Sequence, residues 1–131
     1  MSVKSGPVVA LIEDEPLLRV PLAKALSEAG YRVIAAASGL EGLALLDDPG
    51  IDVAIIDLRL PGRIDGLTLA TEARRQHPGL GVIFASAGAP SDEAVAIGSF
   101  LQKPFTPDEL FDAIRRCLAA RPLARRASSA D

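Results

Sequence analysis

The chain has 131 residues, of which 49% are hydrophobic, and it carries a formal net charge of −3 and one cysteine. This length and apolar content suit one compact domain, while the acidic balance argues against a dedicated nucleic-acid binder and the lone Cys117 excludes an internal disulfide. Because no stretch is both uncharged and apolar over the length of a membrane span, we expect a soluble, cytoplasmic protein without a membrane partner.

The N-terminal part of the chain predicts a strand, a helix and a second strand after a short tail. Residues 1–7 lack an apolar run and are expected to form the tail, whereas Val8–Ile12 is typical of a strand buried on both faces. Residues 16–29 have helical spacing of Leu and Ala, but Pro21 removes a backbone donor there, so we expect a kink or a delayed start. Arg32–Ala36 is the second predicted strand.

The next segment combines a helix start with another apolar strand pattern. Ser38-Gly39-Leu40-Glu41 fits a capping box, in which the serine hydroxyl and the glutamate carboxylate each satisfy a backbone N–H group at the start of a helix. We therefore expect a helix from about Ser38. Residues 52–56 then predict a buried strand that ends just before Asp57.

A third helix and a fourth strand follow, and after them comes a stretch with few helix-forming residues. Asp65 can cap a helix that runs to about Gln76, and residues 80–85 are the fourth predicted strand. Residues 87–98 contain two glycines and a proline, which disfavour helix. The fourth helix should therefore be short or irregular.

The C-terminal part predicts a last strand, a last helix and a polar tail. Ser99–Gln102 is the fifth candidate strand, and Thr106-Pro107-Asp108-Glu109 fits a capping box with proline at the first helical position, where its missing N–H is harmless. Residues 121–131 are rich in Ala, Ser and Arg and are predicted to be a disordered basic tail. The domain is therefore expected to span residues 8–120.

Strand and helix alternate five times along the chain, which indicates an α/β fold with a parallel sheet. In such a sheet, ligands bind beyond the carboxyl ends of the strands. Polar side chains stand at the ends of four predicted strands: Glu13-Asp14-Glu15 after the first, Asp57 after the third, Ser86 after the fourth and Lys103 after the fifth. We expect these groups to converge on one edge of the sheet.

The acidic cluster at this edge points to phosphoryl chemistry assisted by a divalent cation. Crowded carboxylates repel each other and either raise a pKa or recruit a cation. Mg²⁺ suits such a site because it binds through one or two carboxylates and accepts phosphate oxygens as further ligands. Asp57 could then attack phosphorus and form an acyl phosphate, with Lys103 opposing the charge on the transferring group and Ser86 donating a hydrogen bond to it.

Together these motifs resemble the receiver domain of response regulators, over about residues 8–119. The matching features are the acidic pair Glu13-Asp14, Asp57 in DLRLPG, Asp65-Gly66, Ser86 followed by Ala87, and Lys103-Pro104-Phe105. The resemblance implies a flavodoxin-like (βα)5 fold with strand order 2-1-3-4-5, and phosphorylation of Asp57 by a sensor histidine kinase or a histidine phosphotransfer protein. It further implies a downstream protein partner, and a phosphoryl acceptor, monomeric or weakly dimeric, rather than a turnover enzyme.

The resemblance also assigns residues to a metal and to a conformational switch. It implies that four groups surround Mg²⁺: Asp14, Asp57, the backbone carbonyl of Arg59 and, through water, Glu13. The bond between Lys103 and Pro104 should be cis, which an X-Pro bond adopts at low cost. Phe100 matches the aromatic switch position of the family, acting together with Ser86.

Two features depart from the commonest pattern of the family. Gly62-Arg63-Ile64 places one more residue than usual between Pro61 and Asp65, so the loop beside Asp57 should bulge. The short stretch after Ser86 is similar to that of a subgroup of receivers with a shortened fourth helix. We therefore expect phosphorylation to signal through a surface other than the usual one around that helix.

Three other kinds of protein compete with this interpretation. A phosphatase of the haloacid dehalogenase type needs a second acid two residues after its nucleophile, but position 59 is Arg. A flavodoxin-like cofactor binder needs a phosphate-cradling loop after the first strand, where residues 13–15 are all acidic. A receiver-shaped interaction module that works without phosphorylation has the same sequence features, and that alternative stays open.

Overall fold

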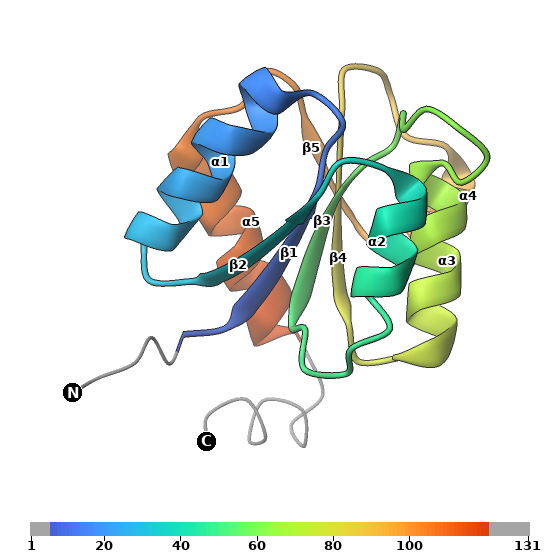
Figure 1. The fold of residues 1–131 in the computed structure, drawn as a ribbon, viewed down its shortest axis with the longest axis horizontal. Coiled ribbons are helices and arrows are strands. Elements are labelled where there is room, and N and C mark those ends of the chain that lie inside the picture. Colours follow the sequence, from blue (N-terminus) through green and yellow to red (C-terminus); the bar gives the residue numbers. More distant parts are fainter. Residues whose placement is uncertain (1–5, 121–131) are drawn as a thin grey trace.

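A five-stranded parallel sheet with helices on both faces forms the fold (Figure 1). The computed structural model describes residues 6–120, so residues 1–5 of the tail predicted for residues 1–7, and the whole tail predicted for residues 121–131, lie outside the described part. The strand order is β2-β1-β3-β4-β5, and neighbouring strands are parallel. This order confirms the predicted flavodoxin-like (βα)5 architecture. Within the described part, no helix has both the length and the apolar character needed to cross a bilayer.

Ten elements alternate along the described part of the chain. The strands are β1 (Val8–Ile12), β2 (Arg32–Ala36), β3 (Val53–Asp57), β4 (Gly81–Ser86) and β5 (Ser99–Gln102). The helices are α1 (Pro16–Glu28), α2 (Gly39–Leu45), α3 (Gly66–Gln76), α4 (Asp92–Ile97) and α5 (Pro107–Ala119). β3 and β4 each lie one residue later than predicted, so Asp57 and Ser86 are the last residues of their strands.

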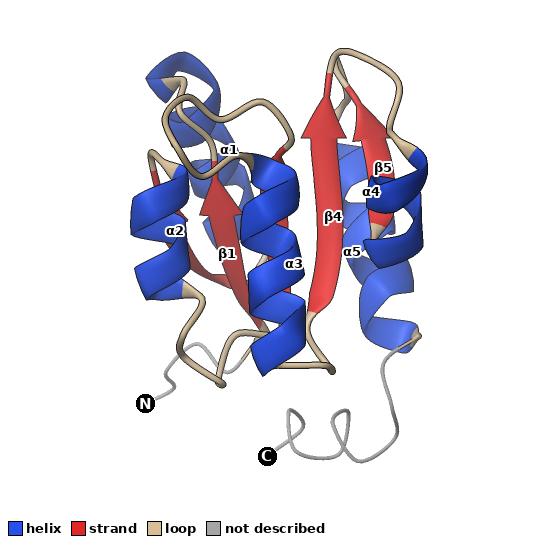
Figure 2. Ribbon diagram, turned by 90° about the vertical axis from the view of Figure 1, so that its right-hand side faces the viewer, coloured by secondary structure: helices blue, strands red, loops and turns tan. Residues whose placement is uncertain are grey.

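The central strands read as continuous apolar runs because both faces of the sheet are covered. Alternate residues of β1 enter different cores: Ala10 and Ile12 pack on the side of α2, α3 and α4, while Val9 and Leu11 pack on the side of α1 and α5. Figure 2 shows α2 and α3 in front of the sheet and α1 and α5 behind it. This two-sided burial fixes the register of each strand and therefore the position of the polar residues at its end.

The first helix runs through its internal proline. Of the two effects predicted for Pro21, the delayed start is wrong, because α1 begins at Pro16 and includes Pro21, while the kink stays a prediction. Proline at the first position lacks only an N–H that would have no helical partner there. Pro21 is exposed, as is Leu17 one turn earlier, so the Leu17 carbonyl that loses its helical partner can bond water instead.

The two predicted capping boxes differ in the structure. At α5, Glu109 N–H donates to the Thr106 hydroxyl and the Glu109 carboxylate accepts from Thr106 N–H, which confirms the box. At α2, the Ser38 hydroxyl accepts from Glu41 N–H, but the Glu41 carboxylate accepts from Ala37 N–H instead of Ser38 N–H. Half of that box is therefore present, and the other half is displaced by one residue.

The fourth helix is short, as predicted, because α4 has 6 residues. A single residue, Gly98, separates it from β5. The first residue of β5, Ser99, pairs with Ile83 of β4. The first two residues of β4, Gly81 and Val82, therefore have no partner on β5.

Candidate functional site

The carboxyl ends of four strands bring the predicted polar residues to one edge of the sheet, the upper edge in Figure 1. Glu13 and Asp14 follow β1, and Asp57 ends β3. Ser86 ends β4, and Lys103 follows β5. Because β1 lies between β2 and β3, the chain reverses its winding direction beside β1, which is where α/β sheets form ligand crevices.

Lys103 joins the two most deeply buried acids of this edge. Its Nζ donates to Glu13 Oε1 at 2.8 Å and to Asp57 Oδ2 at 3.1 Å. Glu13 is 3% exposed and Asp57 is 7% exposed. The peptide bond between Lys103 and Pro104 is cis, as the resemblance implied. The ammonium group thus links β5 to the ends of both β1 and β3.

The electrostatics of this edge follow from burial and from the single ammonium group. Burial raises the pKa of Glu13, and the hydrogen bond from Lys103 offsets this only in part. Burial alone lowers the pKa of Lys103, but the hydrogen bonds to Glu13 and Asp57 outweigh it and raise the pKa. Lys103 therefore keeps its charge at neutral pH and holds together carboxylates that would otherwise repel each other.

Three carboxylates are close enough to share one cation. Glu13, Asp14 and Asp57 each offer an oxygen, and these oxygens all lie within 4.8 Å of one another. Both Glu13 oxygens are already engaged, since Oε2 accepts from Glu15 N–H at 3.1 Å. Within residues 6–120, the half-buried Asp14 carboxylate has no hydrogen-bond partner. Asp14 is therefore the acid most available to a cation.

The backbone of the loop after β3 fixes the position of the Asp57 carboxylate. Arg59 N–H donates to Asp57 Oδ1 at 2.9 Å, while Leu58 N–H donates to the Ala85 carbonyl at 3.1 Å. Gly66 at the start of α3 packs so closely that a β-carbon there would overlap the Asp57 carbonyl oxygen. The backbone around Asp57 is thus fixed by hydrogen bonds on one side and by close packing on the other.

The loop that is predicted to carry an extra residue contains a turn and packs inward. Gly62 has φ of 93°, a conformation that glycine adopts without strain. Ile64 packs against the core on the α3 side. Its carbonyl oxygen lies against Gly39, where a β-carbon would overlap it. The observed path of this loop therefore requires a glycine at the first position of α2.

We expect Gly66→Ala to destabilise the protein by about 1–3 kcal/mol, because its methyl group would force the Asp57 backbone to shift. Urea denaturation of the variant measures this loss as a lower midpoint. Gly88→Ala is a suitable control, since the nearest atom to a β-carbon there is Arg59 Nη2 at 3.4 Å. An unchanged midpoint for Gly66→Ala would mean that the loop beside Asp57 is not tightly packed.

The two residues assigned to the switch occupy different surroundings. Ser86 is 3% exposed, and its hydroxyl oxygen accepts from Gly88 N–H at 3.3 Å, which leaves its O–H able to donate. Phe100 is half-buried and packs against the core on the α3 and α4 side. Its role as a switch stays a prediction.

One residue of the site escaped the sequence analysis. Arg19 in α1 donates from Nη1 to the backbone carbonyl of Glu13 at 2.8 Å and to that of Asp14 at 3.3 Å. This guanidinium group fixes the backbone of the acidic segment after β1. An arginine six residues after an acid in a helical segment has no distinctive sequence pattern, so only the fold reveals the contact.

Comparison with known proteins identifies relatives over most of the chain. A family model described as the response regulator receiver domain matches residues 9–115. The transcriptional regulatory protein TcrA of Mycobacterium tuberculosis is 35% identical over 126 residues, which cover 92% of this chain and 49% of TcrA. The transcriptional regulatory protein GlrR of Escherichia coli is 38% identical over 109 residues, which cover 79% of this chain and 24% of GlrR. The chain thus spans half or less of the length of these relatives.

Solved structures share the fold as well. A response regulator receiver protein from Sinorhizobium medicae superimposes with a TM-score of 0.80 at 29% identity, covering 89% of this chain and 98% of that one. The agreement extends to the strand order described above.

Proposed function

Because this chain belongs to the response regulator receiver domain family, we propose that Asp57 accepts a phosphoryl group and that the phosphorylated form controls a partner protein. The donor is a phosphorylated histidine of a sensor kinase or of a phosphotransfer protein. The observation that carries the proposal is the position of the Asp57 carboxylate at the end of β3, held between Lys103 Nζ and Arg59 N–H. Held in this way, the carboxylate needs little reorganisation before it attacks phosphorus.

The transfer itself exchanges one bond to phosphorus for another. An Asp57 carboxylate oxygen forms a bond to phosphorus while the bond from phosphorus to the donor imidazole nitrogen breaks, and that nitrogen keeps the electron pair. Lys103 opposes the negative charge on one side of the transferring group, and the Ser86 O–H can donate to a phosphoryl oxygen. The product is an acyl phosphate on the protein, so the chain is an acceptor and not a turnover enzyme.

The donor set of the acidic cluster suits Mg²⁺. The oxygens of Asp14 and Asp57 and the backbone carbonyl of Arg59 would hold the ion, which when bound neutralises charge on the phosphoryl oxygens. Glu13 would act through water, which agrees with the engagement of both its oxygens by Lys103 and Glu15. The ammonium of Lys103 alone leaves the cluster with excess negative charge that a divalent ion can offset.

Asp14→Asn should weaken Mg²⁺ binding by about 100-fold or more, whereas Glu13→Gln should weaken it by only about 10-fold. The difference follows from the proposed roles, since Asp14 would contact the ion and Glu13 would only orient its water. Titration of Mg²⁺ followed by NMR chemical shifts of the amides around Asp57 measures both affinities. Equal losses in the two variants would contradict this division of roles.

Incubation with acetyl phosphate and Mg²⁺ tests the proposed function directly. We expect intact mass spectrometry to show one added phosphoryl group, and peptide mapping to place it on Asp57. Failure of acetyl phosphate and of phosphoramidate to label the protein would overturn phosphoryl acceptance. It would favour a receiver-shaped interaction module that works without phosphorylation.

A further inference from the structure

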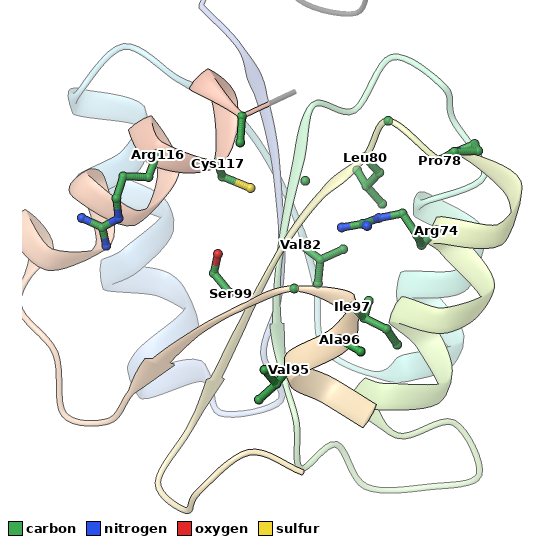
Figure 3. Close-up of a pocket in the computed structure, with 14 residues that line it drawn as sticks. Arg74, Pro78, Leu80, Val82, Val95, Ala96, Ile97, Ser99, Arg116 and Cys117 are labelled. Atoms are coloured by element: carbon green, nitrogen blue, oxygen red, sulfur yellow. The ribbon is translucent and has the colours of Figure 1, made fainter. Parts of the chain in front are cut away.

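A pocket of about 490 Å³ lies at the end of the sheet opposite Asp57 (Figure 3). It lies where β4 extends two residues beyond β5, so that Gly81 and Val82 pair with β3 on one side but have no partner on the β5 side. The chain leaves α4 at Ile97 and enters β5 after Gly98, which packs closely on Val82. The pocket volume falls in the range of small-molecule sites, roughly 300–1,000 Å³.

The lining of this pocket combines apolar walls with positive charge. Ile97, which is half-buried, and Val95, which is exposed, are apolar lining residues that a ligand can reach, while Leu80 and Val82 line the pocket but are almost fully buried (Figure 3). Among residues 6–120, the charged lining residues are Arg74 from α3 and Arg116 from α5, and none of the lining residues is acidic. The pocket thus has the opposite charge to the acidic cluster at the other end of the sheet.

Arg74 has unsatisfied hydrogen-bonding capacity inside this pocket. Its Nε is buried and has no hydrogen-bond partner among the described residues, and within residues 6–120 no carboxylate forms an ion pair with it. In Figure 3 its guanidinium group points from α3 into the pocket, between Leu80 and Ile97. A buried hydrogen-bond donor without a partner destabilises the protein, so a ligand that accepts a hydrogen bond from it gains binding free energy.

The neighbouring Arg75 forms the paired hydrogen bonds to a carboxylate that Arg74 lacks. Arg75 is exposed and forms two hydrogen bonds with Glu72, from Nε to Oε1 at 3.1 Å and from Nη2 to Oε2 at 2.6 Å. Both arginines lie in the last turn of α3 and have the same side chain. Only Arg74 is directed into a pocket, where the planar guanidinium could form the same paired bonds with an external anion.

We infer that this pocket binds a small organic anion, with a carboxylate or phosphate on Arg74 and an attached apolar group against Ile97 and the exposed Val95. An inorganic ion would leave the apolar walls exposed to water, and an uncharged apolar ligand would leave the Arg74 Nε without a partner. The binding site is separate from the proposed phosphorylation site, because Ser86 and Lys103 stand at the opposite ends of β4 and β5. It does not depend on phosphorylation of Asp57.

NMR titration of the protein without Mg²⁺ tests the inference, with phenyl phosphate and benzoate as probes. We expect both probes to shift the amide signals of Gly81, Gly98 and Ser99. Inorganic phosphate has the anionic group without the apolar ring, and phenol has the ring without the anionic group. Both should bind at least about 10-fold more weakly. The stronger of the two organic anions identifies whether the site prefers a phosphate or a carboxylate. Shifts confined to the residues around Asp57 would overturn the proposed site.

Variants of the two arginines provide the matched comparison. Arg74→Gln should weaken binding of the preferred probe by about 10-fold or more, while Arg75→Gln, with the same loss of charge, should change it less than about twofold. Equal losses in both variants would show that general surface charge attracts the probe and would overturn the inference. Arg74→Lys keeps the charge without the planar donor pair, so it should bind more weakly than the original protein even if Arg74→Gln does not fold.

A further measurement needs no variant. Cys117 lines the same pocket, so saturating phenyl phosphate or benzoate should slow alkylation of its thiol by iodoacetamide. Phenol at the same concentration should protect the thiol much less. An alkylation rate unaffected by either anion would place the anion elsewhere and contradict the inference.

Discussion

Replacing Asp57 with asparagine is expected to reduce labelling by acetyl phosphate and Mg²⁺ to below about 1% of the original level, because an amide cannot serve as the nucleophile. The fold should persist. The asparagine carbonyl can still accept from Arg59 N–H, as Asp57 Oδ1 does at 2.9 Å. The hydrogen bond to Lys103 is lost, but the repulsion that Asp57 exerts on Glu13 is lost too. Thermal denaturation should therefore show little change in stability.

A second buried aspartate offers a matched control for this variant. Asp52 is 7% exposed, as is Asp57, but it lies just before β3, where its Oδ2 accepts from Val8 N–H at 2.8 Å. Asp52→Asn should therefore be labelled as the original protein is. Labelling that persists in Asp57→Asn would move the acceptor to another residue, and loss of labelling in both variants would point to a general effect on the fold.

The sequence predicted the place of the site because the site follows from topology. Five predicted strands, four of which are followed by a polar residue of the site, are enough to locate the strand ends, and the parallel arrangement puts those ends on one edge. Asp57 and Ser86 lie where this argument expects them, with an error of one residue in the strand bounds. These signals are local in sequence, which is why the pattern of hydrophobic residues reveals them.

The contacts within the site could not be predicted in the same way. Lys103 lies 90 residues from Glu13 and 46 from Asp57 in sequence, and its choice of both acids depends on side-chain lengths and on which carboxylates are buried. The contact between Arg19 and the carbonyl of Glu13 depends on the angle at which α1 packs on the sheet. Such details are decided by tertiary packing and leave no periodic pattern in the sequence.

The wrong prediction of a delayed start at Pro21 has a related cause. Helix propensity describes the cost of proline in an isolated helix, whereas α1 packs its opposite side against the sheet through Leu26 and neighbouring apolar residues. Tertiary burial stabilises the helix on one side, and water can satisfy the broken hydrogen bond on the other. A local rule thus failed because the residue faces solvent, which the sequence pattern around Pro21 does not show.

Replacing Lys103 is expected to cause a large loss of folding stability. Without Mg²⁺ and at pH 7, Lys103→Met should lower the free energy of unfolding by about 2–3 kcal/mol, because it leaves two buried carboxylates without their cation. The loss should be smaller than for a fully buried pair, since the Lys103 side chain is 21% exposed and partly solvated. Urea denaturation measures it. Lys24→Met, which replaces an exposed lysine in α1, should have little effect.

The loss of stability should depend on pH. The pKa of Glu13 is already raised above its ordinary value of 4.5, and it should rise further without Lys103. Between 4.5 and the raised pKa, the folded state binds more protons than the unfolded state, so stability falls as pH rises through this window. The free energies of unfolding of Lys103→Met and of the original protein should therefore differ least near the lower end of this pH window and most above it. A difference that stays constant across the window would show that electrostatic repulsion is not its cause.

Lys103→Met should still be phosphorylated in the presence of Mg²⁺, yet it should fail to transmit the change. The ion would offset the charge of the carboxylates and the phosphoryl group, but the ammonium that links Asp57 to the end of β5 would be missing. Beryllofluoride with Mg²⁺ mimics the phosphoryl group, so NMR shifts report the response. In the variant they should persist at Ser86 and Gly88 and shrink at Phe100. Shifts at Phe100 as large as in the original protein would show that the signal reaches β5 without Lys103.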